Sequence, residues 1–350
     1  MLSQFKSLSH SIQGVEAFFR YLMIDVMLAA PKNKDKEFAS VISDEYRKFF
    51  KFERRKPLIF TTKAKALYQS SKNLSDLQVK KLQEAYFTNI QIEKLCNKEL
   101  RPIRYSDLKL YFATEEDEAY LTAFKAFCND FYTSYIHLAE FGDTYGSLDD
   151  YYKQLVRSKR TCRCCGISNI LTEHNTPRDA FDHYLPKSIY PYVSVCFKNL
   201  VPTCYTCNSS YKGDIDTLFE GEAYAEKQVK AFFPFSTDEH SLDNQIKVSI
   251  RLVHMMEKNM PLEDIEISFQ CSGHEEELKN WQRIYHIEEQ YKAFCADEDR
   301  ILEMMGIADS YAWDKSSVQT TLERYESMGY FDGCFLKAAL LRAVIESLKI

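Results

Sequence analysis

The sequence contains 350 residues, of which 45% are hydrophobic and 27% are charged, and its formal net charge is −6 at pH 7. This length suffices for two or three domains, and the composition is that of a folded globular protein. The negative charge excludes a protein that coats nucleic acid through its overall charge, whereas a protein that contacts nucleic acid in one groove needs only a local basic surface.

Several features favour a cytoplasmic protein with no membrane association. No apolar run is long enough to cross a bilayer, and the first residues lack the layout of a secretory signal. Eleven cysteines would indicate disulfide bonds in an exported protein, but four of them have metal-binding spacing, so a reducing compartment is expected. Aromatic residues are abundant and Gly and Pro are scarce. We therefore expect a predominantly helical, well-packed α+β protein.

Residues 1–150 have the apolar spacing of helices, two of which are predicted within Val15–Ala29 and over Leu77–Leu100. Thr114 precedes Glu115, Glu116 and Asp117, a helix-start signature in which the hydroxyl accepts from a free amide and the acids favour the positive helix end. An apolar stripe with steps of three and four follows, and we interpret it as core: Tyr120, Phe124, Phe127, Phe131, Tyr135 and Leu138. The turn-rich segment Gly142–Asp150 predicts the end of a helical N-terminal domain, residues 1–150.

Two basic runs are present in this acidic chain. The first, Lys51 to Lys56, includes Arg54 and Arg55, and we interpret it as a solvated face. The second lies directly before and within the first cysteine pair and consists of Arg157, Lys159, Arg160 and Arg163. Its position leaves two interpretations open, contact with phosphate groups or an ordinary solvated face.

Two Cys-x-x-Cys pairs are the strongest signal in the chain: Cys162 with Cys165, and Cys204 with Cys207. Four thiolates in two such knuckles form a tetrahedral site that suits Zn²⁺. Cys164 is an extra thiol in the first pair, and the two-residue spacing selects its neighbours instead. Gly166 fits a knuckle, because a residue without Cβ is easily accommodated there. We predict a structural zinc ion that stabilises a segment too small to fold by its own core.

Four residues between and beside these pairs have the chemistry of phosphodiester hydrolysis: Asp182, His183, Asn199 and Asn208. On a strand, Asp182 and His183 would face opposite ways, so the carboxylate could bind a divalent cation while the imidazole takes a proton from water. Asn208 follows a zinc ligand directly, so a rigid element could present its amide oxygen to the same cation, Mg²⁺ or Mn²⁺. Weaker candidates for phosphate contacts are Lys187, Lys212, Arg160 and Arg163.

The C-terminal part mixes strands and helices. Alternating apolar and polar residues predict a strand over Gln245–Val253, and Ile265–Phe269 is its candidate partner. Helical spacing follows over Glu275–Met305 and Leu336–Leu348. These residues predict a mixed C-terminal domain, 226–350.

In combination, these motifs resemble those of the HNH (ββα-metal) endonuclease family, in the subclass whose finger is held by four cysteines. The resemblance covers about residues 160–216 and implies an HNH nuclease domain within 151–225. It implies that Asp182 binds the catalytic ion, that His183 is the general base and that Asn199 orients His183. The last motif position is often histidine in the family but is Asn208 here, a His-Asn-Asn variant similar in this respect to the HNH domain of the RNA-guided CRISPR nuclease.

The first functional hypothesis is therefore a metal-dependent endonuclease. The resemblance implies phosphodiester hydrolysis, with DNA as the expected substrate and 5′-phosphate and 3′-hydroxyl ends as products. One such site cuts one strand at a time, so duplex cleavage needs two subunits, as in a homodimer, or two visits. The alternative is a zinc-dependent module that binds nucleic acid without chemistry. Nucleases with helical flanks also resemble effectors of restriction or phage defence, which implies a sensor or ATPase partner protein.

Overall fold

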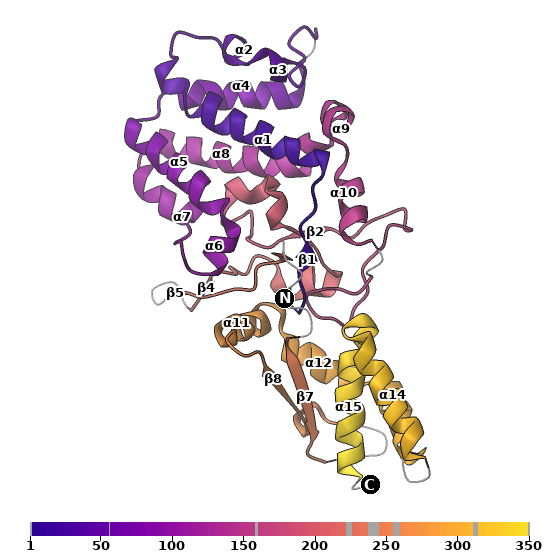
Figure 1. The fold of residues 1–350 in the computed structure, drawn as a ribbon. Coiled ribbons are helices and arrows are strands. Elements are labelled where there is room, and N and C mark those ends of the chain that lie inside the picture. Colours follow the sequence, from indigo (N-terminus) through magenta and orange to yellow (C-terminus); the bar gives the residue numbers. More distant parts are fainter. Residues whose placement is uncertain are drawn as a thin grey trace.

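The structure is a computed structural model that describes residues 2–55, 57–157, 160–221, 226–236, 245–254, 260–310 and 314–348. Lys56 and Lys159, from the two basic runs, lie outside these residues. The fold is predominantly helical α+β, with small two-stranded sheets and the four cysteines in the middle region. In Figure 1 the N-terminal helices form one end of an elongated molecule, and the C-terminal strands and helices form the other. Within the described ranges, no helix is long and apolar enough to span a membrane.

The N-terminal part is helical, as predicted. Its longest helix starts at the predicted cap, where the Thr114 hydroxyl accepts from the Asp117 amide and the Asp117 carboxylate accepts from the Thr114 amide. The α-helices of this part are α1 (Gly14–Arg20), α2 (Phe38–Val41), α3 (Asp44–Arg47), α4 (Ile59–Ser71), α5 (Asp76–Asn89), α6 (Ile92–Cys96), α7 (Tyr105–Leu108), α8 (Glu115–Thr133), α9 (Ala139–Tyr145) and α10 (Leu148–Leu155). A π-helical stretch, η2 (Tyr21–Met27), continues α1, and η5 (Tyr135–His137) is a 3-10 turn after α8.

Aromatic side chains form the core of this part. The ring of Phe18, on α1, contacts rings from four other segments at centroid distances of 4.9 to 6.2 Å: Phe49, Phe60, Phe131 and Phe141. The predicted stripe is buried along α8, which confirms its interpretation as core. It leaves the helix after Thr133, so Tyr135 lies in η5.

Two predictions for this part are wrong in detail. Leu77–Leu100 is not one helix, because Asn89 ends α5 and exchanges two side-chain hydrogen bonds with the Ile103 backbone, at 2.7 and 3.0 Å. Gly142–Asp150 is mostly helical rather than turn-rich, because α9 and α10 occupy most of it. Ser147 accepts a hydrogen bond from the Asp150 amide at 3.1 Å and so caps α10 inside the segment.

The middle region follows the order strand, strand, helix. β2 (Phe181–His183) pairs antiparallel with β3 (Leu200–Pro202), which confirms a strand at Asp182 and His183. The connection contains two 3-10 helices, η6 (Pro191–Val195) and η7 (Phe197–Asn199), and a π-helical turn, η8 (Thr206–Lys212), follows β3. Other short strands flank this region: β1 (Phe5–Lys6) pairs with β6 (Phe235–Ser236), and β4 (Phe219–Glu220) pairs with β5 (Lys227–Gln228).

The C-terminal part contains the predicted strand pair and helices. β7 (Lys247–Leu252) pairs antiparallel with β8 (Ile265–Gln270) over its full length. The predicted helical segment Glu275–Met305 comprises α11 (Glu275–Tyr285), α12 (Ile287–Cys295) and most of α13 (Glu298–Asp309), and α14 (Lys315–Met328) and α15 (Cys334–Ser347) complete the fold. α15 packs along β7, and α11 packs against η8, so this part rests directly on the middle region (Figure 1).

Candidate metal centre and hairpin site

The four predicted zinc ligands form one cluster. Their sulfur atoms all lie within 4.8 Å of one another, and all four side chains are buried. Around Zn²⁺ with tetrahedral bonds of about 2.3 Å, sulfur atoms lie about 3.8 Å apart, and Cys165 Sγ lies 4.0 Å from Cys204 Sγ. Among the described residues, no other group of three or more His, Cys, Asp or Glu side chains converges in this way. The donor set fits a structural zinc ion.

Backbone amides support the sulfur cluster. The Cys204 amide points at Cys162 Sγ, and the Cys207 amide points at Cys204 Sγ, each at 3.4 Å. Such N–H groups stabilise thiolates, because they place a positive dipole end beside the negative sulfur. The second knuckle therefore also contributes hydrogen bonds to the sulfur atoms.

The geometry of the first knuckle explains why residue 166 is glycine and why Cys164 is not a member of the sulfur cluster. Gly166 has a φ of +72°, and a Cβ there would lie 2.3 Å from the Leu2 side chain, so only glycine fits. Cys164 lies outside the cluster. Burial raises the pKa of its thiol, and the neighbouring Cys162 raises it further, so Cys164 stays protonated. The cluster consists of the four cysteines that the spacing selects.

Both ends of the chain close around this first knuckle. Trp281 on α11 and Tyr291 on α12 each donate a 2.8 Å hydrogen bond to one of its carbonyl groups. The side-chain amide of Gln290 points at Cys207 Sγ from 3.8 Å. From the other end, the Leu2 amide donates to a third knuckle carbonyl at 2.9 Å. The cysteine cluster is therefore the junction of three parts of the chain.

His183 is held between the hairpin and α8, where its side chain is partly buried. Its Nε2 lies 2.9 Å from the Ser194 carbonyl oxygen. Because a carbonyl oxygen only accepts, Nε2 carries a proton and Nδ1 keeps its lone pair. Loss of hydration lowers the pKa of His183 to about 3, and the charges of Lys187 and Lys212 act in the same direction, although the Ser194 bond opposes them. The imidazole is therefore neutral at pH 7.

Asn199 clamps the loop that holds His183. It is fully buried; its Oδ1 accepts from the Leu185 amide at 2.7 Å, and its Nδ2 donates to the carbonyls of Leu185 and Val193 at 2.9 and 3.3 Å. These bonds fix the two ends of the loop, and the next residue, Ser194, provides the carbonyl that binds the imidazole. An orienting role of Asn199 would therefore act through the backbone.

Asp182 faces the interior, away from His183. It is 2% exposed, its Oδ1 accepts from Lys212 Nζ at 2.7 Å, and the same ammonium donates to the His183 carbonyl at 2.8 Å. Burial raises the pKa of the Asp182 carboxyl, while the Lys212 charge opposes that rise. Oδ2 makes no hydrogen bond of ordinary geometry, and the buried Tyr285 hydroxyl is a polar neighbour. The predicted ion ligand is thus already paired with an internal cation.

The other predicted residues differ in exposure. Asn208 is partly exposed on η8, and Lys187 is partly exposed near His183. Arg160 is exposed and lies over an aromatic ring at 5.6 Å. Arg163 is 8% exposed and stacks over a ring at 4.5 Å, and Lys212 is 1% exposed. Phosphate contact by Arg163 or Lys212 does not fit this arrangement, because neither charge faces solvent.

Three residues around the hairpin were not found from the sequence. Tyr132 on α8 meets the His183 ring edge-on, with 4.4 Å between centroids. Ser194 supplies the carbonyl that His183 binds, and its hydroxyl donates to the Cys128 carbonyl on α8 at 2.8 Å. Tyr285 comes from α11. No local pattern identifies these residues, because each contact joins segments far apart in the sequence.

Comparison with protein-family models, with curated proteins and with solved structures found no match to this chain. The function is therefore inferred from the geometry of the site itself.

Proposed function

We propose that this chain is an HNH-type endonuclease that hydrolyses phosphodiester bonds in DNA, with His183 as the general base. The observation that carries the proposal is the setting of His183. The Ser194 carbonyl binds its Nε2 proton, and Nδ1 has no hydrogen-bond partner among the described residues. A neutral imidazole held in this way can accept a proton from water. The strand, strand, helix order around four clustered cysteines also agrees with the ββα resemblance.

In the proposed reaction, His183 Nδ1 takes a proton from water as the water oxygen attacks phosphorus. The bond from phosphorus to the 3′ oxygen breaks, and that oxygen takes a proton from solvent, which gives a 5′-phosphate and a 3′-hydroxyl. The phosphate charge next to the ring stabilises the imidazolium, so a bound substrate raises the pKa of His183 and makes it a stronger base. Lys187, partly exposed near the ring, supports the phosphate.

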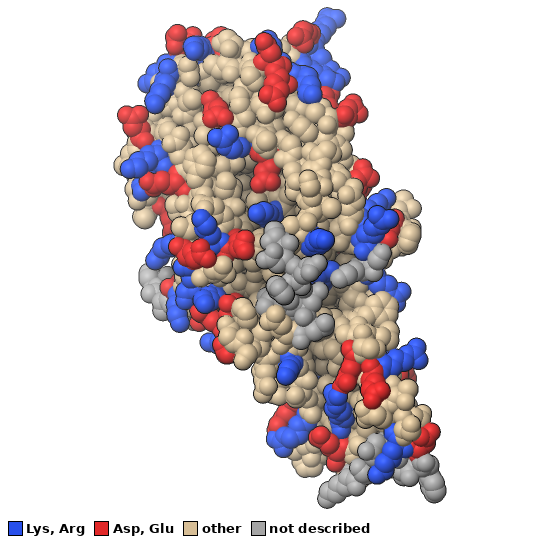
Figure 2. Space-filling model, viewed as in Figure 1, with Lys and Arg blue, Asp and Glu red and all other residues tan. Residues whose placement is uncertain are grey.

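Nucleic-acid contact has to be local in this protein. Figure 2 shows Lys and Arg side chains interspersed with Asp and Glu over the visible face, with no broad patch of either sign. The net charge of −6 gives no general attraction to phosphate. A local contact such as Lys187, near His183, is therefore the expected footprint.

The predicted divalent ion at Asp182 and Asn208 does not fit the present arrangement. Carboxylate and amide oxygens are the donors that Mg²⁺ or Mn²⁺ prefers. However, Asp182 is buried and bonded to the Lys212 ammonium, which would repel a second cation. Binding at Asp182 would require Lys212 to give up both of its hydrogen bonds, so no step of the proposed reaction depends on this ion.

The same ion pair favours a second function, a zinc-dependent module that binds nucleic acid without cutting it. In such a module Asp182 and Lys212 would be structural, joining β2 to η8, and the four cysteines would stabilise the binding surface. The first proposal extends to an effector of restriction or phage defence that acts as a homodimer or with a sensor or ATPase partner.

The two functions differ in a plasmid assay. Purified full-length protein is incubated with supercoiled plasmid, without added metal and with Mg²⁺ or Mn²⁺, and nicked DNA is quantified. We expect nicking by the wild type and a loss of about 100-fold or more in His183→Ala, because an aligned general base contributes about 10²–10⁴ to a rate. His174→Ala is the matched control, since that side chain is 87% exposed in a loop.

Each outcome decides between the two functions. Loss of nicking in His183→Ala with retention in His174→Ala supports the nuclease. If the wild type leaves plasmid intact while retarding its migration, the binding module is correct. Equal nicking by the wild type and His183→Ala would show that His183 is not the base.

A further inference from the structure

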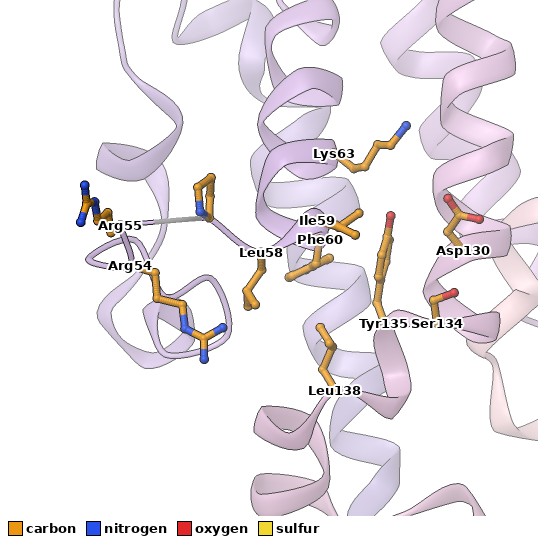
Figure 3. A pocket seen from close by; sticks show the side chains of 11 residues that line it. Arg54, Arg55, Leu58, Ile59, Phe60, Lys63, Asp130, Ser134, Tyr135 and Leu138 are labelled. Atoms are coloured by element: carbon orange, nitrogen blue, oxygen red, sulfur yellow. The ribbon is translucent and has the colours of Figure 1, made fainter.

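A well-defined pocket lies in the N-terminal helical part, away from the hairpin. It encloses about 750 Å³ between the start of α4 and the end of α8 (Figure 3). The lining residues are Arg54, Arg55, Pro57, Leu58, Ile59, Phe60, Lys63, Asp130, Ser134, Tyr135 and Leu138. Its volume lies within the range of about 300–1,000 Å³ that is usual for small-molecule sites.

The three cations at this cavity lie outside the ion pairs of the described residues, although the charge of Arg54 adds to the effect of Lys51 in lowering the pKa of Glu140. Arg54, Arg55 and Lys63 form no ion pair with any described acidic residue, whereas Lys51, from the same basic run, pairs with Glu140. Arg54 and Arg55 are exposed, as their interpretation as part of a solvated face predicts, and both also line the cavity. Three positive charges and one acid, Asp130, give the cavity a net attraction for an anion.

The two arginines and the acid lie on opposite sides of the cavity. In Figure 3 Arg54 and Arg55 lie on one side, Asp130 and Ser134 lie on the other with Lys63 toward them, and apolar side chains lie between the two sides. Ile59 is 74% exposed, so this apolar floor is open to a ligand. Desolvation raises the pKa of Tyr135 to about 12, and the charge of Asp130 and a hydrogen bond with it add to this rise, so the phenol stays protonated. The phenol donates to Asp130, and the remaining lone pairs of this carboxylate can still accept.

This layout matches one class of ligand. A nucleoside phosphate has an anionic group at one end, a flat and largely apolar base, and hydroxyl or amino donors that a carboxylate can accept. The first-turn amides of α4 add to the anion attraction, because the N-cap residue Leu58 has no side chain that could bind them. A purely apolar ligand would make no ion pair with the two arginines. A bare phosphate would make no contact with the apolar side chains or with Asp130.

We propose that this cavity is a nucleotide-binding site, in which Arg54 and Arg55 bind the phosphate, Ile59 and Leu138 contact the base, and Asp130 accepts from the sugar hydroxyls. The site is separate from the hairpin, and the proposal does not rest on the nuclease function. The nucleoside phosphate can be a free nucleotide or the 5′-phosphorylated end of a strand.

Isothermal titration calorimetry on the full-length protein tests this proposal. The probes are AMP, adenosine, inorganic phosphate and a 5′-phosphorylated dinucleotide. We expect AMP to bind, and adenosine and phosphate alone to bind about tenfold more weakly or worse, because each lacks one of the two anchors. A dinucleotide that binds more tightly than AMP identifies a strand end, and one that binds more weakly identifies a free nucleotide.

Variants provide the matched comparison. Arg54→Ala with Arg55→Ala is expected to weaken AMP binding by about tenfold or more, since two charge-assisted hydrogen bonds are lost. Lys65→Ala with Lys94→Ala removes the same charge from exposed positions outside the cavity and is expected to leave the affinity unchanged. The proposal is overturned if AMP does not bind the wild type, if phosphate binds as tightly as AMP, or if both double variants bind AMP like the wild type.

Discussion

At the scale of single residues, the buried pair of Asp182 and Lys212 is the feature with the largest expected effect on stability. Removing one member of a buried ion pair leaves an uncompensated charge and typically costs about 3–5 kcal/mol. We therefore expect Lys212→Met to lower the free energy of unfolding by about this amount. Adding Asp182→Asn to that variant should restore a large part of the loss, because no buried charge is then left without a partner.

Urea denaturation of the wild type, both single variants and the double variant measures this coupling. Lys187→Met is the control, because Lys187 is partly exposed and forms no ion pair with a described residue. If the free energy of unfolding of Lys212→Met lies within about 1 kcal/mol of the wild-type value, the ion pair does not stabilise the fold. Asp182 would then be accessible rather than held in a buried pair.

The sequence predicted the identity of the site residues better than their contacts. The two-residue spacing chose Cys162 and Cys165 over Cys164, because a knuckle has a fixed geometry. Lys212 was a weak candidate for phosphate contact, but its side chain is buried. Its direction depends on the π-helical turn that carries it, and helix propensities do not distinguish that turn from an α-helix.

At the scale of elements, Glu16 ties α1 to the segment before β3. Its carboxylate accepts hydrogen bonds from the Cys196 thiol and the Phe197 amide, but burial raises its pKa above the ordinary 4.5. A carboxyl with a raised pKa in the folded state contributes stability that is complete below the unfolded pKa and is lost as the pH rises through the folded pKa. Glu16 therefore becomes a cost to stability at neutral and alkaline pH.

Glu16→Gln keeps the shape of the side chain and removes this cost. Relative to the wild type, we expect its midpoint of thermal unfolding to be higher at about pH 8 and similar or lower at about pH 5. Differential scanning calorimetry across this range measures the change, with the exposed Glu93→Gln as control. If the difference in unfolding midpoint between Glu16→Gln and the wild type does not vary with pH, the pKa of the Glu16 carboxyl is not raised in the folded protein.

Elements were predictable where local signals were complete. The Thr114 cap and the alternation over Gln245–Val253 gave α8 and β7 within a few residues. The break between α5 and α6 was not predictable, because the Asn89 side chain bonds to the distant Ile103 backbone. The apolar spacing of the helix does not indicate a hydrogen bond to a distant segment.

At the scale of the whole molecule, the cysteine cluster joins segments that the sequence assigned to separate domains. Bonds from Leu2, Trp281 and Tyr291 all end on carbonyl groups of the first knuckle. We therefore expect chelation of zinc to loosen residues 2–6, the hairpin and α11–α12 together. The core of α4 and α8 should keep its protection, because its aromatic contacts do not involve the knuckles.

Hydrogen–deuterium exchange with and without chelator measures this pattern. Faster exchange confined to the knuckle peptides would show that the C-terminal part folds independently of the metal. Uniform loss of protection, including α4 and α8, would show one cooperative unit instead.

The junction of the three parts of the chain depends on four thiolates at one zinc ion, and X-ray absorption with metal analysis of the purified protein tests this directly. We expect one zinc ion per chain with four sulfur ligands at about 2.3 Å. Zinc should be retained in Cys164→Ser and lost in Cys165→Ser, since only the second side chain belongs to the cluster. Nitrogen or oxygen among the zinc ligands, or equal loss of zinc from both variants, would contradict a site of these four thiolates.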